Sequence, residues 1–363
     1  MKPPLRGRRQ TGRRTTIHRD PAKVAILYGA VAADAAPDEQ DVLVEVETVR
    51  AGLVALGYAP VILSITLDLE AARQRLMHLR PGFVFNLVES VEGQGRLIHL
   101  APALLESLGL PFTGSGADAA YVTSNKPLAK RLMAAASITT PAWAEPARKP
   151  EFPGPYIVKS VWEHASVGID DGSLTSDPAR LAGLIRKRQR RHGGEWFVEA
   201  YVEGREFNLS LLGGAEGVEL LPPAEMCFVD YPPGKPRIVN YAAKWDEAAF
   251  EYHATQRRFD FPAGDNDLLA RLNATAKACW RLFDLHGYAR VDCRVDGEGH
   301  VHVLEININP CLSPDAGFAA AAARAGLDLP AVLQRILGDL GTPAMRQADA
   351  ASLVCASASG PER

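Results

Sequence analysis

The sequence predicts an α/β fold that becomes α+β in its C-terminal half. Between residues 24 and 108, short apolar runs alternate with segments of helical spacing, a pattern typical of a parallel sheet covered by helices. From about residue 196, strand-like segments follow one another with only short breaks, which indicates antiparallel sheets. A late pair of alternating segments, at 288–295 and 301–308, forms the clearest hairpin of the chain.

Composition narrows the class of protein. The chain has 363 residues, of which 47% are hydrophobic and 23% charged, enough for two or three globular modules. Its net charge of -3 favours neither nucleic acid nor an acidic membrane surface as a partner. Five cysteines without paired spacing indicate a reducing compartment. With no apolar run near the roughly 20 residues of a membrane helix, we expect a cytoplasmic protein.

Both ends of the chain are predicted to be disordered. Residues 1–20 are strongly basic with almost no apolar side chain, and residues 341–363 are small and polar. The basic arm has three interpretations that the sequence leaves open: contact with nucleic acid or acidic partners, a solvated tail, or a start codon assigned too early.

The first module is predicted to span residues 21–116. Strands are expected at 24–28, 61–65 and 83–87, with helices over 42–56, 68–79 and 97–108. No G-x-G-x-x-G follows the first strand, so a dinucleotide site is not indicated. The turn-rich segment 113–116 marks the expected boundary.

The second module, residues 117–205, carries two lysines in unusual places. Lys126 follows a helix-capping Ser-Asn pair and precedes a proline, and Lys159 lies on the apolar strand 156–160. Both are candidate phosphate ligands, although an exposed lysine near a helix end is the commoner situation for Lys126. The small residues 164–168 form a loop of the kind that lets backbone N–H groups approach phosphate.

The third module, residues 206–340, contains the late hairpin. Strand alternation places Arg290, Asp292, Glu305 and Asn307 on one face, over an apolar opposite face that includes Leu304. A four-residue loop at 296–299 would set Arg290 opposite Glu305 and Asp292 opposite Val303. Two carboxylates and an amide oxygen suit Mg²⁺ or Mn²⁺, whereas an ordinary solvated sheet face is the commoner interpretation of such a hairpin alone.

Several motifs in register make residues 24–340 resemble the ATP-grasp superfamily and, within it, the D-alanine–D-alanine ligases. The most specific are G-Y-A-R-V-D at 287–292 and L-E-I-N-I-N-P at 304–310. The E-x-x-V-x-G-x-E pattern at 199–206, the A-K-W triplet at 243–245 and the lysine strand agree with it. The resemblance implies two antiparallel-sheet subdomains that sandwich ATP, and a homodimer formed through the first module.

The resemblance also implies residue roles. Magnesium that bridges the ATP phosphates would be held by Asp292, Glu305 and Asn307. The nucleotide and the reacting phosphoryl group would be contacted by Lys126, Lys159, Ser166, Glu199, the backbone of Val202, Glu206, Lys244 and Arg290. Of these, Arg290, Lys244 and Ser166 would act in catalysis, by positioning and charge stabilisation.

The implied reaction forms an amide in two steps. ATP phosphorylates a substrate carboxylate, and the amine of a second, amino-acid-like substrate attacks the acyl phosphate, which releases ADP and phosphate. Two rival functions remain open: a catalytically silent nucleotide-binding module and an ATP-grasp kinase with another acceptor.

The substrate half departs from the family pattern. The family's G-G-x-S-x-E reads Y-G-A-V-A-A-D-A-A-P-D-E here, so Asp38 or Glu39 would replace the glutamate that holds the first amino group. The family's H-G-x-x-G-E-D-G appears as F-N-L-V-E-S-V-E-G, with Glu92 at the acid. These changes predict a different acid or amine.

The loop after Pro310 also departs from the family. The serine that receives the second substrate's carboxylate is not matched in residues 311–317. The backbone N–H of Cys311 would still serve the developing oxyanion. The Cys311 thiol is either reactive or, more commonly for such a residue, a small buried hydrophobe.

Overall fold

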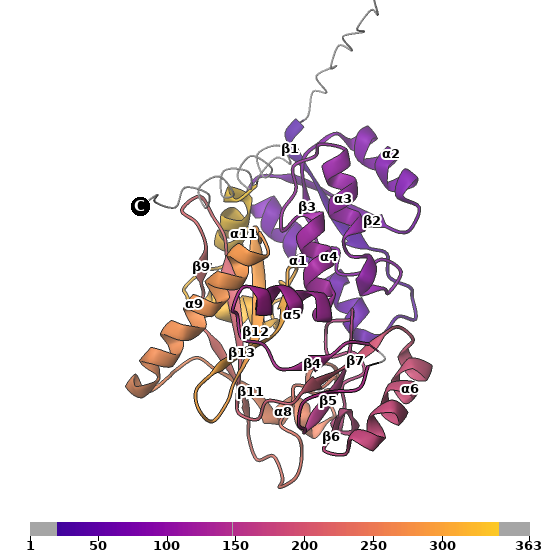
Figure 1. The fold of residues 1–363 in the computed structure, drawn as a ribbon. Helices are drawn as coiled ribbons and strands as arrows, with labels where there is room; N and C mark the ends of the chain where they lie inside the picture. The colour runs from indigo at the N-terminus through magenta and orange to yellow at the C-terminus, as the bar shows by residue number, and fades with distance from the viewer. Residues whose placement is uncertain (1–19, 147, 341–363) are drawn as a thin grey trace, which may run out of the picture.

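The computed structural model describes residues 20–146 and 148–340 (Figure 1). The expected tail and, apart from Asp20, the expected basic arm lie outside these residues. Within the described ranges, no helix combines the length and the hydrophobicity needed to cross a bilayer.

The first module is a parallel sheet buried on both faces. Its strand order is β2-β1-β3, and all of its pairs are parallel. Along β1, Val24 and Ile26 enter one hydrophobic cluster while Ala25 and Leu27 enter another, so the strand is apolar throughout. The elements are β1 (Asp20–Gly29), α1 (Pro37–Ala55), β2 (Ala59–Ile65), α2 (Leu69–Leu79), β3 (Pro81–Asn86), the short helix η1 (Gly95–Leu97) and α3 (Leu100–Ser107).

The second sheet lies at the opposite end of the molecule from α2, as Figure 1 shows. Its order is β4-β7-β5-β6, all antiparallel, and α6 packs against β7 and β5. The elements of this part are α4 (Ala117–Ser124), α5 (Lys126–Ala135), β4 (Trp143–Ala144), β5 (Tyr156–Ser160), η2 (Asp171–Ser173), β6 (Leu174–Thr175), η3 (Pro178–Arg180), α6 (Leu181–His192) and β7 (Trp196–Ala200).

The third sheet carries the hairpin at its β12–β13 edge. Its order is β11-β10-β8-β12-β13, with β9 paired to β8. Its elements are β8 (Arg205–Leu212), β9 (Glu219–Leu220), β10 (Ala224–Phe228), α7 (Ala242–Trp245), α8 (Phe250–Ala254), β11 (Thr255–Arg258), η4 (Ala263–Asp265), α9 (Asn266–Leu282), β12 (Tyr288–Val295), β13 (Val301–Asn307), α10 (Gly317–Arg324) and α11 (Leu329–Gly338). The module boundaries 116/117 and 205/206 stay predictions.

The predicted pairing within the hairpin is wrong, although the shared polar face is correct. The loop has five residues, 296–300, because the Asp296 carboxylate accepts hydrogen bonds from the N–H groups of Glu298 and His300. An irregularity after Asp292 then shifts the register once more. Asp292 therefore lies opposite Glu305, and Arg290 opposite Asn307.

The same irregularity moves Leu304 away from the apolar face. Ile306 and Ile308 stay in the core as predicted, but Leu304 lines a cavity beside Glu305. A β-bulge adds one residue to a strand and so turns the next side chains to the other face. This extra residue brings the Asp292 and Glu305 carboxylates opposite each other.

Candidate active site

Two adjoining cavities lie between the three sheets. The first, about 670 Å³, is lined by the polar face of β12 and β13, by β5 and β7 and by the segment around α7; we name it the hairpin cavity. The second, about 980 Å³, is lined by loops of the first module and by residues 162–170; we name it the N-terminal cavity. They share Asp38, Glu89 and Glu163 in their walls, so groups bound in one can approach groups bound in the other.

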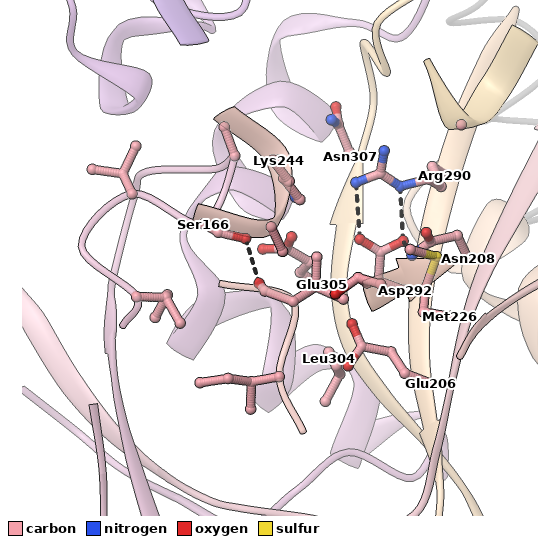
Figure 2. Close-up of a pocket in the computed structure, with 18 of the residues that line it drawn as sticks. Ser166, Glu206, Asn208, Met226, Lys244, Arg290, Asp292, Leu304, Glu305 and Asn307 are labelled. Carbon is pink, nitrogen blue, oxygen red and sulfur yellow. Dashed lines mark hydrogen bonds and ion pairs between the residues drawn. The ribbon is translucent and has the colours of Figure 1, made fainter. Parts of the chain in front are cut away.

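The three predicted metal ligands come together in the hairpin cavity. Asp292, Glu305 and Asn307 all line it, from the paired strands β12 and β13 (Figure 2). The Arg290 guanidinium donates from Nε and Nη2 to the two oxygens of Asp292, at 2.8 and 2.9 Å. Asn208 donates from Nδ2 to Asp292 at 2.8 Å. These donors fix the carboxylate within the cavity.

Asn208 was missed by the sequence reasoning. It lies on β8 directly opposite Asp292, in a strand whose neighbouring residues Phe207 and Leu209 enter the core. The available signal was a polar residue between two apolar ones in a strand. Strand alternation places such a side chain on the face opposite the core.

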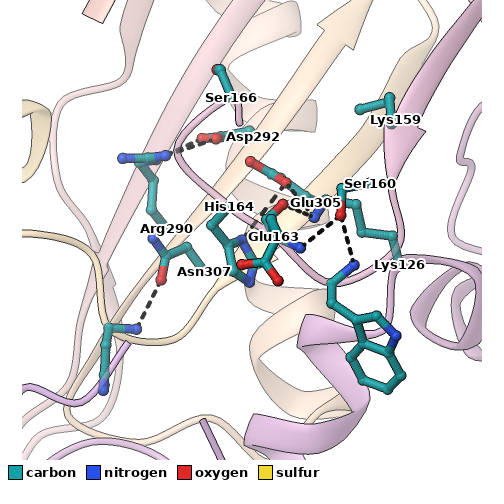
Figure 3. Close-up of polar contacts among 12 residues, drawn as sticks. Lys126, Lys159, Ser160, Glu163, His164, Ser166, Arg290, Asp292, Glu305 and Asn307 are labelled. Carbon is teal, nitrogen blue, oxygen red and sulfur yellow. Dashed lines mark hydrogen bonds and ion pairs between the residues drawn. The ribbon is translucent and has the colours of Figure 1, made fainter. Parts of the chain in front are cut away.

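Glu305 lies close to cationic lysines and to His164, whose pKa burial and the charge of Lys126 lower to about 3, so that this histidine is neutral. Its carboxylate lies 3.4 Å from the Lys126 Nζ and 3.7 Å from the His164 Nδ1 (Figure 3). Burial by itself would raise the pKa of Glu305, but the charge of Lys126 and its neighbours outweighs burial and holds that pKa well below its usual range. Glu305 is therefore ionised and can bind a cation.

Lys126 is a buried residue of the site. It is 3% exposed, and its Nζ also donates to the Glu163 carbonyl at 2.6 Å. The Asn125 side chain caps α5 by accepting from the Leu128 N–H, which starts the helix at Lys126. The alternative of an ordinary exposed lysine is therefore wrong.

Glu199 forms ion pairs with two lysines. Its carboxylate is 2% exposed and lies 3.2 Å from the Nζ of Lys159 and 2.6 Å from that of Lys130. Burial lowers the pKa of Lys130 to about 8, against the opposing pull of Glu199. Lys130 was missed, although it follows Lys126 by one helical turn and so faces the same side. Contact of Glu199 with adenine stays a prediction.

The predicted nucleotide contacts Val202 and Glu206 are joined by one arginine. Arg294 donates from Nε and Nη2 to the Glu206 carboxylate, at 3.0 and 2.7 Å, and from Nη1 to the Val202 carbonyl, at 2.9 Å. All three residues line the hairpin cavity. Their contacts with a nucleotide stay predictions.

Two segments meet beside the polar face of the hairpin. The backbone at Ala165 and Ser166 is left-handed, with φ of 55° and 62°. The Ser166 hydroxyl donates to the Val239 carbonyl at 2.8 Å, and the Trp245 indole donates to the Ala165 carbonyl at 3.2 Å. The loop 164–168 is thus tied to the segment that carries Lys244. Burial and the nearby Arg290 lower the pKa of Lys244.

The predicted substrate residues have different outcomes. Glu39 lines the N-terminal cavity and Cys311 lines the hairpin cavity. The Cys311 thiol donates to Asp41 at 3.0 Å, and burial raises its pKa well above the usual range, which favours the unreactive interpretation. Glu92 is exposed, lines neither cavity and accepts from the Leu67 N–H at 3.3 Å.

Glu89 lies where Glu92 was expected. It lines both cavities, just beyond the carboxyl end of β3. Ligands of open parallel sheets bind at that end of the strands, and this was the sequence signal that favoured Glu89 over Glu92. Burial raises the pKa of Glu89 to about 7, with Asp41 adding to the shift and Arg290 opposing it.

We expect Glu89 to reduce stability as the pH rises. A carboxyl whose folded pKa is raised keeps its proton in the fold while the unfolded chain loses it, so stability falls between about pH 4.5 and pH 7. From pH 5 to pH 7.5, the unfolding free energy of the wild type should fall by on the order of 2 kcal/mol more than that of Glu89→Gln, as measured by urea titration. The exposed Glu92→Gln should follow the wild type. Parallel profiles for the wild type and Glu89→Gln would disprove the assignment.

Comparisons with known proteins identify relatives of this chain. A family profile described as the D-ala D-ala ligase C-terminus matches residues 136–338. The D-alanine–D-alanine ligase of Anaeromyxobacter sp. is 30% identical over 87% of this chain and 96% of its own length, and that of Gloeobacter violaceus is 28% identical over 87% and 98%. An uncharacterized protein of Sinorhizobium fredii, y4sG, is 32% identical over 70% of this chain and 74% of its own length.

A solved structure shows the same fold. The crystal structure of the D-alanine–D-alanine ligase of Bacillus anthracis, complexed with ATP, superposes with a TM-score of 0.67 at 20% identity, over 91% of this chain and 99% of that one. The arrangement of one parallel and two antiparallel sheets is the ATP-grasp fold, which confirms the predicted fold class. The chain belongs to the D-alanine–D-alanine ligase family.

Proposed function

We propose that the protein is an ATP-dependent carboxylate–amine ligase that forms an amide through an acyl phosphate and releases ADP and phosphate. The observation that carries the proposal is the convergence, in one cavity, of three oxygen ligands with Lys126, Lys159, Lys244 and Arg290. Phosphoryl transfer depends mainly on positioning and on cations around the transferred group, and this cavity supplies both.

In this function, ATP would lie along the hairpin cavity. Glu199 and the backbone of Val202 would meet adenine, and Glu206 would meet the ribose hydroxyls. The phosphates would then lie toward the lysines and Arg290, under the loop that carries Ser166.

Magnesium fits the residues of the hairpin. In the described part of the chain, no three His, Cys, Asp or Glu side chains cluster as a metal site. Magnesium commonly takes only one or two carboxylates and completes its shell with phosphate oxygens and water. Asp292, Glu305 and Asn307 would hold the ion, which neutralises phosphate charge when bound.

The chain's own residues would then act on the reacting groups. Arg290, held by Asp292, would stabilise the phosphoryl group in transfer and the oxyanion of the following step, together with the Cys311 N–H. Lys244 would position the terminal phosphates. Ser166 and its loop would exclude water, which otherwise hydrolyses an acyl phosphate.

The substrate is proposed to differ from D-alanine. Ala165 stands where the family motif has a serine, and Asp38, Glu39 and Glu89 contribute three carboxylates to the N-terminal cavity. We further propose that the reaction takes place in the cytoplasm, where ATP is supplied. The partners of the protein would be small acids and amines rather than nucleic acid or membrane. The protein would form a homodimer.

A phosphate-release screen tests the proposed function. Purified protein with ATP and Mg²⁺ is given paired D- and L-amino acids, hydroxy acids and small amines. We expect release only when a carboxylate and an amine are both present. Formation of ADP without free phosphate in the presence of a single acceptor would indicate the kinase alternative, and ATP binding without turnover across the panel would indicate the silent module.

A further inference from the structure

Arg257 is a cation in the hairpin cavity that the assignments above do not use. It lies on β11, and its side chain lines the cavity together with Asp315, Ala316 and Gly317 of the loop after Pro310. Its Nη1 donates to the Asp315 carbonyl at 3.0 Å. A Cβ atom placed on Gly317 would lie 3.6 Å from the Arg257 Nε, so the guanidinium stands directly beside this loop.

Among the residues that the structure describes, Arg257 forms no ion pair with a carboxylate, and Asp315 acts on it only as a nearby charge. Arg290, which lies nearby in space, and Arg258, which is adjacent in sequence, both form ion pairs with carboxylates. Arg257 forms none with the described residues. Arg257 is exposed on β11, and partial desolvation and the like charge of Arg290 lower its pKa, against the opposing charge of Asp315. Two guanidinium groups that face one cavity favour an anion between them.

The adjacent Arg258 lies outside both cavities and is already paired with a carboxylate. Its Nη2 lies 2.5 Å from the Glu225 carboxylate, which Arg205 also binds. It lines neither cavity, as strand alternation requires of the residue next to Arg257. The two arginines therefore form a natural pair of test and control positions.

The loop beside Arg257 offers no free hydroxyl. Ser313 is fully buried, and its hydroxyl is paired with the Cys311 Sγ at 3.1 Å. Ala316, which lines the cavity next to the guanidinium, has no polar side-chain atom. Arg257 is therefore the charged donor beside a loop that has no free hydroxyl.

We propose that Arg257 binds the carboxylate of the amino acid that serves as the acceptor. The inference rests on the proposed ligase function and adds to it the residue that receives this carboxylate. A planar guanidinium binds a carboxylate through two parallel hydrogen bonds, which fixes both the position and the direction of the acceptor. The acceptor amine is thereby aimed at the acyl phosphate near Arg290.

The test compares acids with their carboxamides. The amino acid pair that gives the fastest phosphate release in the screen is used at saturating ATP, with the acceptor supplied either as the free acid or as its carboxamide. In the wild type, the free acid should have the lower KM, by on the order of 10- to 100-fold. Arg257→Ala should remove most of this preference and leave the KM for ATP within about twofold. Arg257→Lys should keep part of it, and Arg258→Ala all of it.

The possible outcomes distinguish a failure of the proposed ligase function from a failure of the inference about Arg257. If no pair releases phosphate, the proposed function fails and the inference fails with it. If release occurs with acids and carboxamides equally, or Arg257→Ala raises both KM values alike, only the inference is overturned. If Arg257→Ala mainly raises the KM for ATP, Arg257 contacts phosphate and the inference is again overturned. The acid-to-amide ratio is independent of how much of each variant is folded.

Discussion

Glu305→Gln should abolish ATP turnover while the fold stays intact. The amide is nearly isosteric but removes the negative charge that faces the Lys126 Nζ at 3.4 Å, and it removes one of the two carboxylates proposed for magnesium. Losing one preorganised electrostatic contact in an active site typically lowers kcat by about 10²–10³-fold, and loss of the metal as well would deepen the effect. Phosphate release measures the turnover, and far-UV circular dichroism with urea unfolding measures the fold.

Glu298→Gln is the matched control for that experiment. Glu298 lies in the loop of the same hairpin, and its side chain is 83% exposed. Its replacement should leave kcat unchanged. Turnover in Glu305→Gln at the wild-type rate would remove Glu305 from the metal site, and a loss of native circular dichroism would show that the effect is structural.

Arg290→Lys should lower kcat by about 10²-fold with little change in stability. Lysine keeps the positive charge but cannot make the two parallel bonds to Asp292, at 2.8 and 2.9 Å, while also facing the reacting phosphoryl group. The loss should appear in kcat more than in the KM for ATP, because the contact strengthens as charge develops in the transition state. Steady-state phosphate release at varied ATP separates the two parameters.

Arg281→Lys controls for a general effect of exchanging arginine for lysine. Arg281 is exposed near the end of α9, away from both cavities. A kcat for Arg290→Lys within about threefold of the Arg281→Lys value would contradict the role assigned to Arg290.

Local patterns were enough to predict the parallel sheet and the polar face of the hairpin. The strand at 24–28 is apolar on both faces because helices cover both sides, so its continuous run of hydrophobic residues had one natural interpretation. The motifs at 287–292 and 304–310 predicted the family, which the comparisons confirm.

What the sequence could not supply depends on contacts between distant residues. The hairpin register changed because Asp296 closes a five-residue loop and an irregularity follows Asp292. The sequence predicted the third module only as a run of antiparallel strands, and β11 at 255–258, which carries Arg257, was not identified among them. The pairing of Glu199 with Lys130 joins β7 to α5, a contact that single-strand periodicity does not contain.

The formation of an acyl phosphate is the central claim, and oxygen-18 transfer tests it most directly. The donor acid is supplied with oxygen-18 in both carboxylate oxygens, together with ATP, Mg²⁺ and the acceptor, and the released phosphate is analysed by mass spectrometry. We predict that one labelled oxygen reaches each phosphate, because the carboxylate oxygen that attacks ATP leaves with the phosphoryl group. Unlabelled phosphate, formed at the same rate, would contradict the proposed reaction.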